Sequence, residues 1–201
     1  MTFQHLILIS LWILYCVVHS LLASPSIKRR ISLISGSWFK FYRLGYSIFA
    51  TVSLMGLLTY QINISSLWVL HFTVLRSILG SLLIIPGICI MAISICRYFL
   101  ELSGIQALRG KSLVVHLQRN GLHSYVRHPL YLGTLLSIWG LLLIFPSLAN
   151  LISCIVIQVY VLIGIEIEER KLIVEFGDSY VTYSLTVPRL VPKKRLGRQK
   201  K

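Results

Sequence analysis

The chain has 201 residues, of which 56% are hydrophobic and only 13% are charged, about half the charged share of an average soluble domain. Lysine and arginine outnumber aspartate and glutamate by 20 to 6, which gives a formal net charge of +14. This composition excludes a disordered chain and argues against a soluble globular enzyme, and a nucleic-acid-binding protein would not carry so much apolar sequence. It predicts an all-α integral membrane protein whose charges are confined to its water-facing edges, and the length suits one compact bundle of helices.

Uncharged runs of sequence predict five transmembrane helices. A helix needs about 20 mostly apolar residues to cross the hydrocarbon core, and each of the first three runs fits one crossing. The fourth run, 129–165, has 37 residues and fits two crossings with a turn near Pro146, so we expect a tight helical hairpin. The first run has no basic segment before it and three basic residues after it, so we expect a retained helix rather than a cleaved signal peptide. The predicted helices cover residues 3–23, 44–62, 75–96, 129–146 and 150–167.

The distribution of charge supports five crossings. The segments 24–43, 97–128 and 167–201 then lie on one side of the membrane, and they hold 19 of the 20 lysines and arginines. Only Arg76 falls on the other side, at a helix end from which we expect it to snorkel to the interface. The positive-inside rule makes the basic side cytoplasmic, with the N-terminus outside and the C-terminus in the cytoplasm. All six acidic residues lie on this side too, so we expect polar chemistry at the cytoplasmic boundary.

The cysteines and the C-terminal tail point to ordinary roles. Cys16, Cys89, Cys96 and Cys154 lie inside predicted spans and form no CxxC pair, so we expect apolar core residues and no metal site. The segment 193–201 carries six basic residues in nine. We expect this tail to be solvated and attracted to anionic membrane lipid, not to nucleic acid.

The first constellation that could carry chemistry is the segment 121–133, at the cytoplasmic start of the fourth helix. Pro129 suits a first helical turn, so His128 lies beside the backbone N–H groups of the helix start, and Tyr131 follows three residues on. Arg127 adds a positive charge, which makes this segment a candidate anion-binding and hydrogen-bonding site. The alternative is an ordinary membrane-interface cluster, in which Arg, His and Tyr are common.

Spacing in the last two helices gives two further predictions. Gly133 and Gly140 are seven residues apart, which lets another helix approach closely. Glu166 and Glu169 are three residues apart and share a face at the cytoplasmic end of the fifth helix. Carboxylates this close to hydrocarbon are costly unless they are paired. Their partner is either a cationic side chain of the protein, such as Arg127, or a bound cationic ligand.

A third constellation, 101–106 in the loop after the third helix, is weak alone and is equally typical of an interfacial amphipathic helix. No dinucleotide-binding, phosphate-loop or zinc-protease motif occurs in the sequence. No charged residue lies in the middle of a predicted span, which gives a proton relay or an ion pathway little support.

Several of these motifs together resemble a known family. The Arg-His-Pro-Leu-Tyr-Leu-Gly segment at 127–133 is followed by a helical hairpin, then by Glu-Glu at 168–169 and by Pro-Arg-Leu-Val-Pro at 188–192. This joint pattern resembles the isoprenylcysteine carboxyl methyltransferase and phospholipid methyltransferase superfamily. The Tyr-Cys-Val-Val-His-Ser segment at 15–20, followed by a basic loop and by Tyr-Arg-Leu-Gly-Tyr at 42–46, is similar to methanethiol S-methyltransferase-like and NnrU-type membrane proteins.

The resemblance implies one membrane methyltransferase-like domain, 1–192, with N-terminal helices in 1–96, a catalytic half in 97–192 and the tail 193–201 beyond it. It implies an S-adenosylmethionine-dependent methyltransferase of the bacterial inner membrane, or of the endoplasmic reticulum in a eukaryote, with its active site facing the cytoplasm. The methyl acceptor is then a small thiol or a lipophilic, lipid-like molecule. Alternatives are isoprenylcysteine carboxyl or phospholipid N-methylation, NADPH-dependent reduction as in some sterol reductases, and a non-catalytic accessory role.

The resemblance also suggests roles for single residues. His128 and Arg127 are expected to be catalytic, and either His128 or His123 is a candidate for taking the proton of an acceptor thiol. The isoprenylcysteine enzymes have an arginine, tied to the acceptor carboxylate, at the position of Leu162, and this difference favours a neutral or thiol-like acceptor. The residues expected to bind the cofactor are His128, Tyr131, Gly133, Gly121, Tyr125, Glu166 and Glu169. The residues expected to line the acceptor site are Glu101, Gln106 and Leu162.

Overall fold

The computed structural model describes residues 2–71, 73–103 and 117–192, and this part of the chain is built of helices, which confirms the all-α class. Four helical stretches in it are long and apolar enough to cross a membrane: 3–23, 25–63, 74–97 and 148–176. A fifth apolar helix, 129–144, is shorter. The elements in chain order are α1 (Phe3–Ala23), α2 (Pro25–Ser35), η1 (Gly36–Phe41), α3 (Tyr42–Asn63), α4 (Val74–Ser103), η2 (Gly121–Ser124), α6 (Pro129–Ile144), α7 (Leu148–Phe176) and α8 (Asp178–Thr186).

The helices begin and end close to the predicted bounds, with three differences. Helix α4 continues to Ser103 rather than ending near residue 96, so the first residues of the segment 101–106, expected in a loop, are helical. The basic segment 24–43, expected to be a loop, folds into α2 and η1. Its helix starts because the side chain of Ser24 accepts a hydrogen bond from the Ile27 N–H at 3.3 Å and Pro25 occupies the first turn. Helix α7 continues to Phe176, well beyond the expected end at residue 167, and it carries the glutamates with it.

Helices α4 and α6 pack with their backbones in close contact at two glycine pairs. A Cβ atom placed on Gly133 would lie 2.8 Å from the carbonyl oxygen of Gly87, and one on Gly140 would lie 2.8 Å from that of Gly80. The seven-residue spacing of glycines recurs on both helices, so the pairs lie two turns apart. This confirms the predicted close approach and leaves no room for a side chain at any of the four positions.

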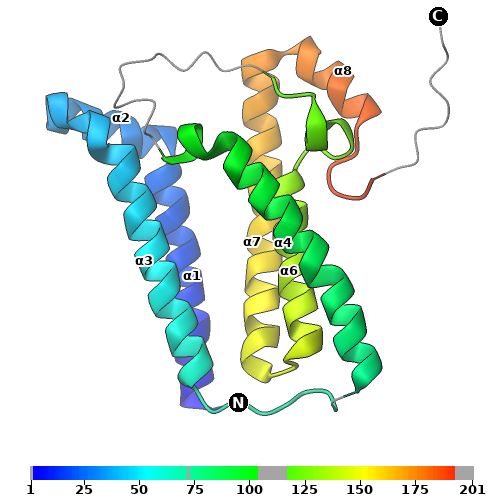
Figure 1. The fold of residues 1–201 in the computed structure, drawn as a ribbon. Helices are drawn as coiled ribbons and strands as arrows, with labels where there is room; N and C mark the ends of the chain where they lie inside the picture. Colours follow the sequence, from blue (N-terminus) through cyan, green and yellow to red (C-terminus); the bar gives the residue numbers. More distant parts are fainter. Residues whose placement is uncertain (1, 72, 104–116, 193–201) are drawn as a thin grey trace, which may run out of the picture.

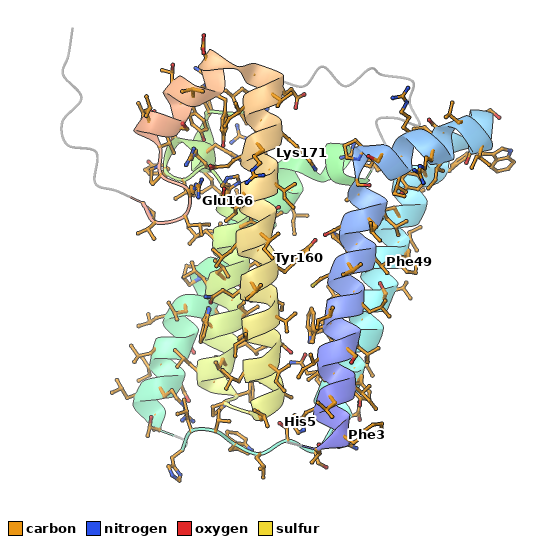
Figure 2. The ribbon with its side chains drawn as sticks, turned by 180° about the vertical axis from the view of Figure 1, so that it is seen from behind. Phe3, His5, Phe49, Tyr160, Glu166 and Lys171 are labelled. Atoms are coloured by element: carbon orange, nitrogen blue, oxygen red, sulfur yellow. The ribbon has the colours of Figure 1, made fainter. Side chains whose placement is uncertain are left out.

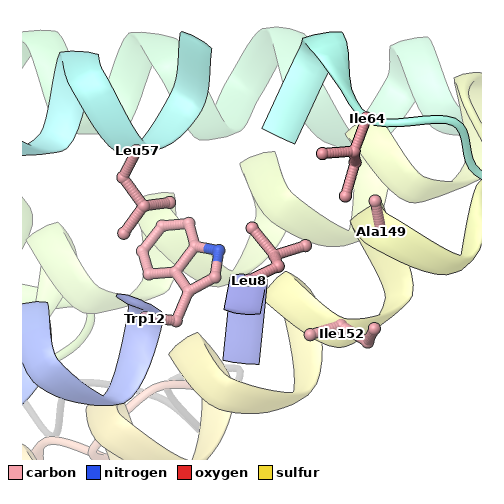
Figure 3. Close-up of a cluster of buried hydrophobic side chains, with 6 residues drawn as sticks. All are labelled: Leu8, Trp12, Leu57, Ile64, Ala149 and Ile152. Atoms are coloured by element: carbon pink, nitrogen blue, oxygen red, sulfur yellow. The ribbon is translucent and has the colours of Figure 1, made fainter. Parts of the chain in front are cut away.

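A buried core joins α1, α3 and α7 at the end of the molecule that carries the N-terminus (Figures 1 and 3). The apolar side chains of this core are Leu8, Trp12, Leu57, Ile64, Ala149 and Ile152. Gln61 links the three helices by accepting from Trp12 Nε1 at 3.2 Å and Ser153 Oγ at 2.7 Å, and by donating to Asn150 Oδ1 at 2.7 Å. Satisfied polar groups of this kind fix how apolar helices dock.

The side chain of Arg76 lies elsewhere than the sequence predicted. Its side chain is buried rather than extended to the membrane interface. Nε donates to the carbonyl oxygen of Leu143 at 2.9 Å, and Nη1 donates to that of His71. The last carbonyls of α6 have no partner within the helix, so the guanidinium caps them and offsets the negative end of the helix dipole.

The other end of the molecule gathers α2, η2 and α8 (Figure 1). Gly177, with φ +52°, turns the chain from α7 into α8. Tyr180, Tyr183 and Val187 then form a second buried cluster that packs against Leu172 of α7. Helix α8 therefore folds back beside the end of α7 and brings the residues that follow it to the start of α6.

Gly140→Ala is expected to destabilise the protein, because the new Cβ would lie 2.7 Å from the Ile84 nitrogen and 2.8 Å from the Gly80 oxygen, both backbone atoms. Overpacking of this kind costs about 1–3 kcal/mol. Thermal unfolding of the detergent-solubilised protein, followed by circular dichroism, would measure the loss. Gly56→Ala on α3 is the control, since nothing lies within 4 Å of its Cβ position. Equal melting temperatures for the two variants would contradict the proposed packing.

Candidate functional site

The start of α6 is held in place by the segment that follows α8. The N–H of Arg127 donates to the carbonyl oxygen of Pro188 at 2.9 Å, and the N–H of His128 donates to that of Arg189 at 3.2 Å. Pro129 occupies the first turn of α6, as its position in the sequence predicts. These contacts bring the side chain of Arg189 to the same place as those of Arg127 and His128.

Glu169 of α7 is the centre of the charged cluster at this point. Only 6% of the residue is exposed, and three cationic or polar groups surround its carboxylate. Oε1 lies 3.1 Å from both Arg127 Nη2 and His128 Nε2, and Oε2 lies 2.9 Å from Arg189 Nε and Nη2. A buried carboxylate is stable only when it is paired in this way. The partners of Glu169 are thus side chains of the protein itself, one of the two alternatives that the sequence left open.

The other two glutamates of α7 have different surroundings. Glu166 pairs with Nη1 of Arg189 and is half exposed. Oε2 of Glu168 lies 3.8 Å from His128 Nδ1, and 45% of its side chain is exposed. The ring of Tyr131 lies 5.7 Å from that of His128, measured between centroids. Glu168 was not among the expected cofactor-binding residues, and within the described part of the chain it differs from Glu166 and Glu169, whose carboxylates pair with arginines.

Three further residues expected at the cofactor site have structural surroundings of their own. Gly133 packs against the backbone of α4. Gly121 has φ +65° and lies against the guanidinium of Arg97, so its lack of a side chain is needed for the turn and for this contact. The side chain of Tyr125 is mostly exposed. Of the tyrosines in this segment, only Tyr131 therefore lies beside His128.

The residues expected on the acceptor side are only partly described. Leu162 lies on α7 with 48% of its surface exposed, and it does not line the groove that opens beside the site. Glu101 is in the last turn of α4, but its side chain lies outside the described part of the chain, as does the whole of Gln106.

Two titratable groups lie next to the cluster, one buried and one partly buried. Tyr180 is 1% exposed, and its ring centroid lies 5.9 Å from the guanidinium carbon of Arg127. Burial raises the pKa of Tyr180 to about 12, and the negative charge of Glu169 adds to this effect. Burial lowers the pKa of His123 below its ordinary value of 6.5, and positive charge on neighbouring side chains lowers it further. Both groups are therefore neutral near pH 7.

A groove of about 840 Å³ runs between α1 and α7 and reaches the charged cluster. Glu168 and Lys171 line it at the end near α8, and Tyr131 contributes from α6. Tyr160 lines it farther along α7, and Figure 2 shows it well removed from Lys171 along this helix. The volume lies in the range of small-molecule binding sites. The groove and the charged cluster together form the candidate site.

Arg189 and the α1 wall of the groove were not expected from the sequence. Arg189 belongs to the Pro-Arg-Leu-Val-Pro segment, and a lone charge in an otherwise apolar segment is the one signal that could have marked it as a partner for a buried carboxylate. The histidine of the Tyr-Cys-Val-Val-His-Ser segment, His19, was noted only as part of a resemblance, and the structure places it in the groove.

Comparison with known proteins adds the following findings. The model of the phospholipid methyltransferase family matches residues 75–179. Methanethiol S-methyltransferase 1 of Bradyrhizobium diazoefficiens is 38% identical over 74 residues, which are 37% of this chain and 25% of that protein. A methanethiol S-methyltransferase of Crocosphaera subtropica is 37% identical over 70 residues, 35% of this chain and 27% of that protein. That of Mycobacterium tuberculosis is 27% identical over 190 residues, 89% of this chain and 74% of that protein. No solved structure matches the chain significantly.

Glu169→Gln is expected to destabilise the fold, because it leaves Arg127 and His128 buried without their counter-charge. Breaking a buried ion pair by removing one partner costs about 3–5 kcal/mol. Thermal unfolding of the purified protein would report the change. Glu175→Gln, an exposed glutamate on the same helix, is the matched control. If both variants have the melting temperature of the wild type, the charged cluster does not stabilise the fold.

Stability is expected to fall as the pH drops below about 6.5, because the unfolded chain protonates His123 before the folded protein does. The folded state favours the neutral imidazole, so its contribution is present above the unfolded pKa and is lost toward lower pH. Melting temperatures at pH 7.5 and 5.5 would be compared for the wild type and His123→Gln. The melting temperature of the wild type should fall more between pH 7.5 and 5.5 than that of the variant. Equal falls would show that His123 does not contribute to the pH dependence of stability.

Proposed function

Since this chain belongs to the phospholipid methyltransferase family, we propose that it is an integral membrane methyltransferase that uses S-adenosylmethionine to methylate a small thiol. The observation that carries the proposal is the meeting of three elements at one point: the start of α6, the glutamates of α7 and the mouth of the α1–α7 groove. The match to the Bradyrhizobium relative covers a quarter of that protein's length, so its activity enters here as support only.

The membrane topology proposed is five crossings, with α6 as the shortest. Its 16 residues span about 24 Å at 1.5 Å per residue, which is somewhat less than the hydrocarbon core of about 30 Å. The positive-inside rule puts the basic end of the bundle, with α2, η2 and α8, in the cytoplasm. The mouth of the groove then faces the compartment in which a charged methyl donor is dissolved, and the active site faces the cytoplasm.

The charges at the mouth suit such a donor, which carries a sulfonium, an ammonium and a carboxylate. When bound, S-adenosylmethionine supplies a methyl group that is activated by its positively charged sulfur. Glu168 offers a carboxylate to the cationic groups of the donor, with Tyr131 beside it. Lys171 lines the same mouth and interacts electrostatically with Lys28. Arg43 also interacts with Lys28, so these three cations, from α7, α2 and α3, are our candidates for holding the donor carboxylate.

The other charged residues have roles in this proposal that differ from those expected from the sequence. Arg127, Glu166 and Glu169 already have partners within the protein. We therefore propose that they position His128 and Tyr131, while Glu168 contacts the donor. Methyl transfer is an in-line displacement, and fixed positions of the reacting groups supply most of its acceleration.

A small neutral thiol suits the groove better than a lipid anion as the acceptor. Most of the residues that line the groove between α1 and α7 are apolar, among them Ile13, Val17, Val156 and Ile163. The relatives named above are methanethiol S-methyltransferases, which also favours a thiol.

The purified protein is expected to transfer a tritiated methyl group from S-adenosylmethionine to a short alkyl thiol. Phosphatidylethanolamine and a farnesylated cysteine would be tested in parallel as acceptors. Glu168→Gln should weaken donor binding, measured by calorimetry, by about tenfold, in line with the loss of one charge-assisted hydrogen bond. Glu175→Gln, at an exposed position that does not line the groove, is the control.

Each other outcome points to a different function. If the tritium label is found in the lipid or in the prenylated cysteine and not in the thiol, the protein is a methyltransferase with a different acceptor from the one proposed. A thermal shift with NADPH and none with S-adenosylmethionine would favour a reductase. Unaltered donor binding by Glu168→Gln would contradict the site assignment.

A further inference from the structure

The α1–α7 groove contains a second polar group, which lies away from the charged mouth. His19 of α1 lines the groove, and its ring stacks on that of Tyr15 with centroids 5.7 Å apart. The hydroxyl of Tyr46, from α3, lies 3.0 Å from His19 Nε2. The ring of Tyr160, from α7, meets that of His19 edge-on at 6.4 Å, and Ser20 Oγ donates to the Tyr160 hydroxyl at 3.2 Å. One imidazole is thus contacted by side chains of three helices within the groove.

The groove joins this polar group to the charged mouth. Tyr160 and Glu168 are eight residues apart on α7, which corresponds to about 12 Å along the helix. Gly164 lies midway between them, and its Cβ position is 3.5 Å from the hydroxyl of Tyr131. The absence of a side chain at Gly164 keeps the passage open beneath Tyr131, so one small molecule at the mouth and another near His19 share a single cavity.

The histidines near the mouth are less suited to act on an acceptor. Both ring nitrogens of His128 face carboxylates, Nε2 that of Glu169 and Nδ1 that of Glu168, and the residue is 4% exposed. His123 does not line the groove. His19 does, and the hydroxyl of Tyr46, which lies 3.1 Å from Nδ1 and 3.0 Å from Nε2, can bond only one of the two ring nitrogens at a time.

Building on the proposed function, we propose that the α1–α7 groove holds the acceptor thiol and that His19 is the base that removes its proton. The S–H proton moves to a ring nitrogen of His19. The sulfur lone pair then forms the bond to the methyl carbon as the bond from that carbon to the donor's sulfonium sulfur breaks. The products are a thioether, the neutral donor thioether and one proton, which His19 releases to solvent. No net oxidation or reduction occurs.

Tyrosines and a thiol surround this imidazole. The titratable groups that face it are Tyr15 and neighbouring Cys16 of α1, Tyr46 of α3 and Tyr160 of α7. The charged residues of the groove, Glu168 and Lys171, lie at its mouth. Hydroxyl groups orient the ring without fixing a charge on it, which suits a group that must gain and lose a proton.

His19→Gln tests the assignment. With a short alkyl thiol, which is mostly protonated at pH 7.5, kcat should fall by about 100-fold, the low end for loss of a general base. With an aromatic thiol that is already ionised at this pH, the variant should keep most of the wild-type kcat. Donor binding by calorimetry should change less than twofold, since the donor groups lie at the mouth. His71→Gln, an exposed histidine in the loop before α4, is the matched control and should behave as the wild type.

The results separate the two proposals. If the wild type binds the donor but methylates neither thiol, the proposed function fails and the role of His19 fails with it. If the wild type is active and kcat of His19→Gln falls equally with both thiols, His19 is not a base. If His19→Gln keeps full activity with both, the assignment alone is wrong.

A second variant tests the groove should His19→Gln not fold. Gly164→Leu would fill the passage beneath Tyr131 and should raise the KM for the thiol by about tenfold. Gly164→Ala, whose Cβ makes only ordinary contacts at 3.5 and 3.8 Å, should leave KM unchanged. An unchanged KM for Gly164→Leu would overturn the acceptor site.

Discussion

The buried charge of Glu169 is the constraint on which the functional end of the molecule depends. Burial of a carboxylate beside hydrocarbon costs several kcal/mol of free energy unless the carboxylate is paired with cations. Arg127, His128 and Arg189 meet it from two chain segments, one at the start of α6 and one after α8. The arrangement orders both segments and fixes the imidazole of His128. It also occupies the arginines, so that Glu168 remains as the carboxylate facing the groove.

The packing of the helices explains why a groove exists at this end. Helices α1 and α7 touch through Leu8, Trp12, Ala149 and Ile152 at the opposite end, where Gln61 also ties them to α3. Farther along, residues 16–25 of α1 and the chain after it line the groove instead of contacting α7 tightly. Helices α4 and α6 pack closely on each other through their glycines. The site lies between α7, with Tyr131 of α6 beside it, and α1, which diverges from α7 toward this end (Figure 1).

Uncharged runs could predict most of the helices, because burial in lipid demands a continuous apolar stretch, and α1 begins and ends at the predicted residues. The glycine spacing in α6 likewise predicted a close contact. Helix α2 and the end of α7 were not predicted, since their basic and acidic residues look like a solvated loop when only hydropathy is considered. The buried position of the Arg76 side chain and the pairing of Arg189 with Glu169 depend on residues that only folding brings together. The sequence around either arginine therefore could not predict them.

The charges at the mouth also decide how two substrates would reach the proposed site. Glu168 supplies negative charge to the mouth, since Glu166 and Glu169 are paired with arginines. Lys171 of α7 lines the same mouth and, together with Lys28 of α2 and Arg43 of α3, supplies positive charge. A zwitterionic donor is attracted to this mouth in one orientation, whereas an apolar thiol gains nothing from it. Such a thiol partitions into the bilayer, and the uncharged part of the groove, around His19 and Tyr160, is where it would enter. Donor and acceptor therefore need not compete for one entrance, and the donor can close the mouth to water before the thiol loses its proton.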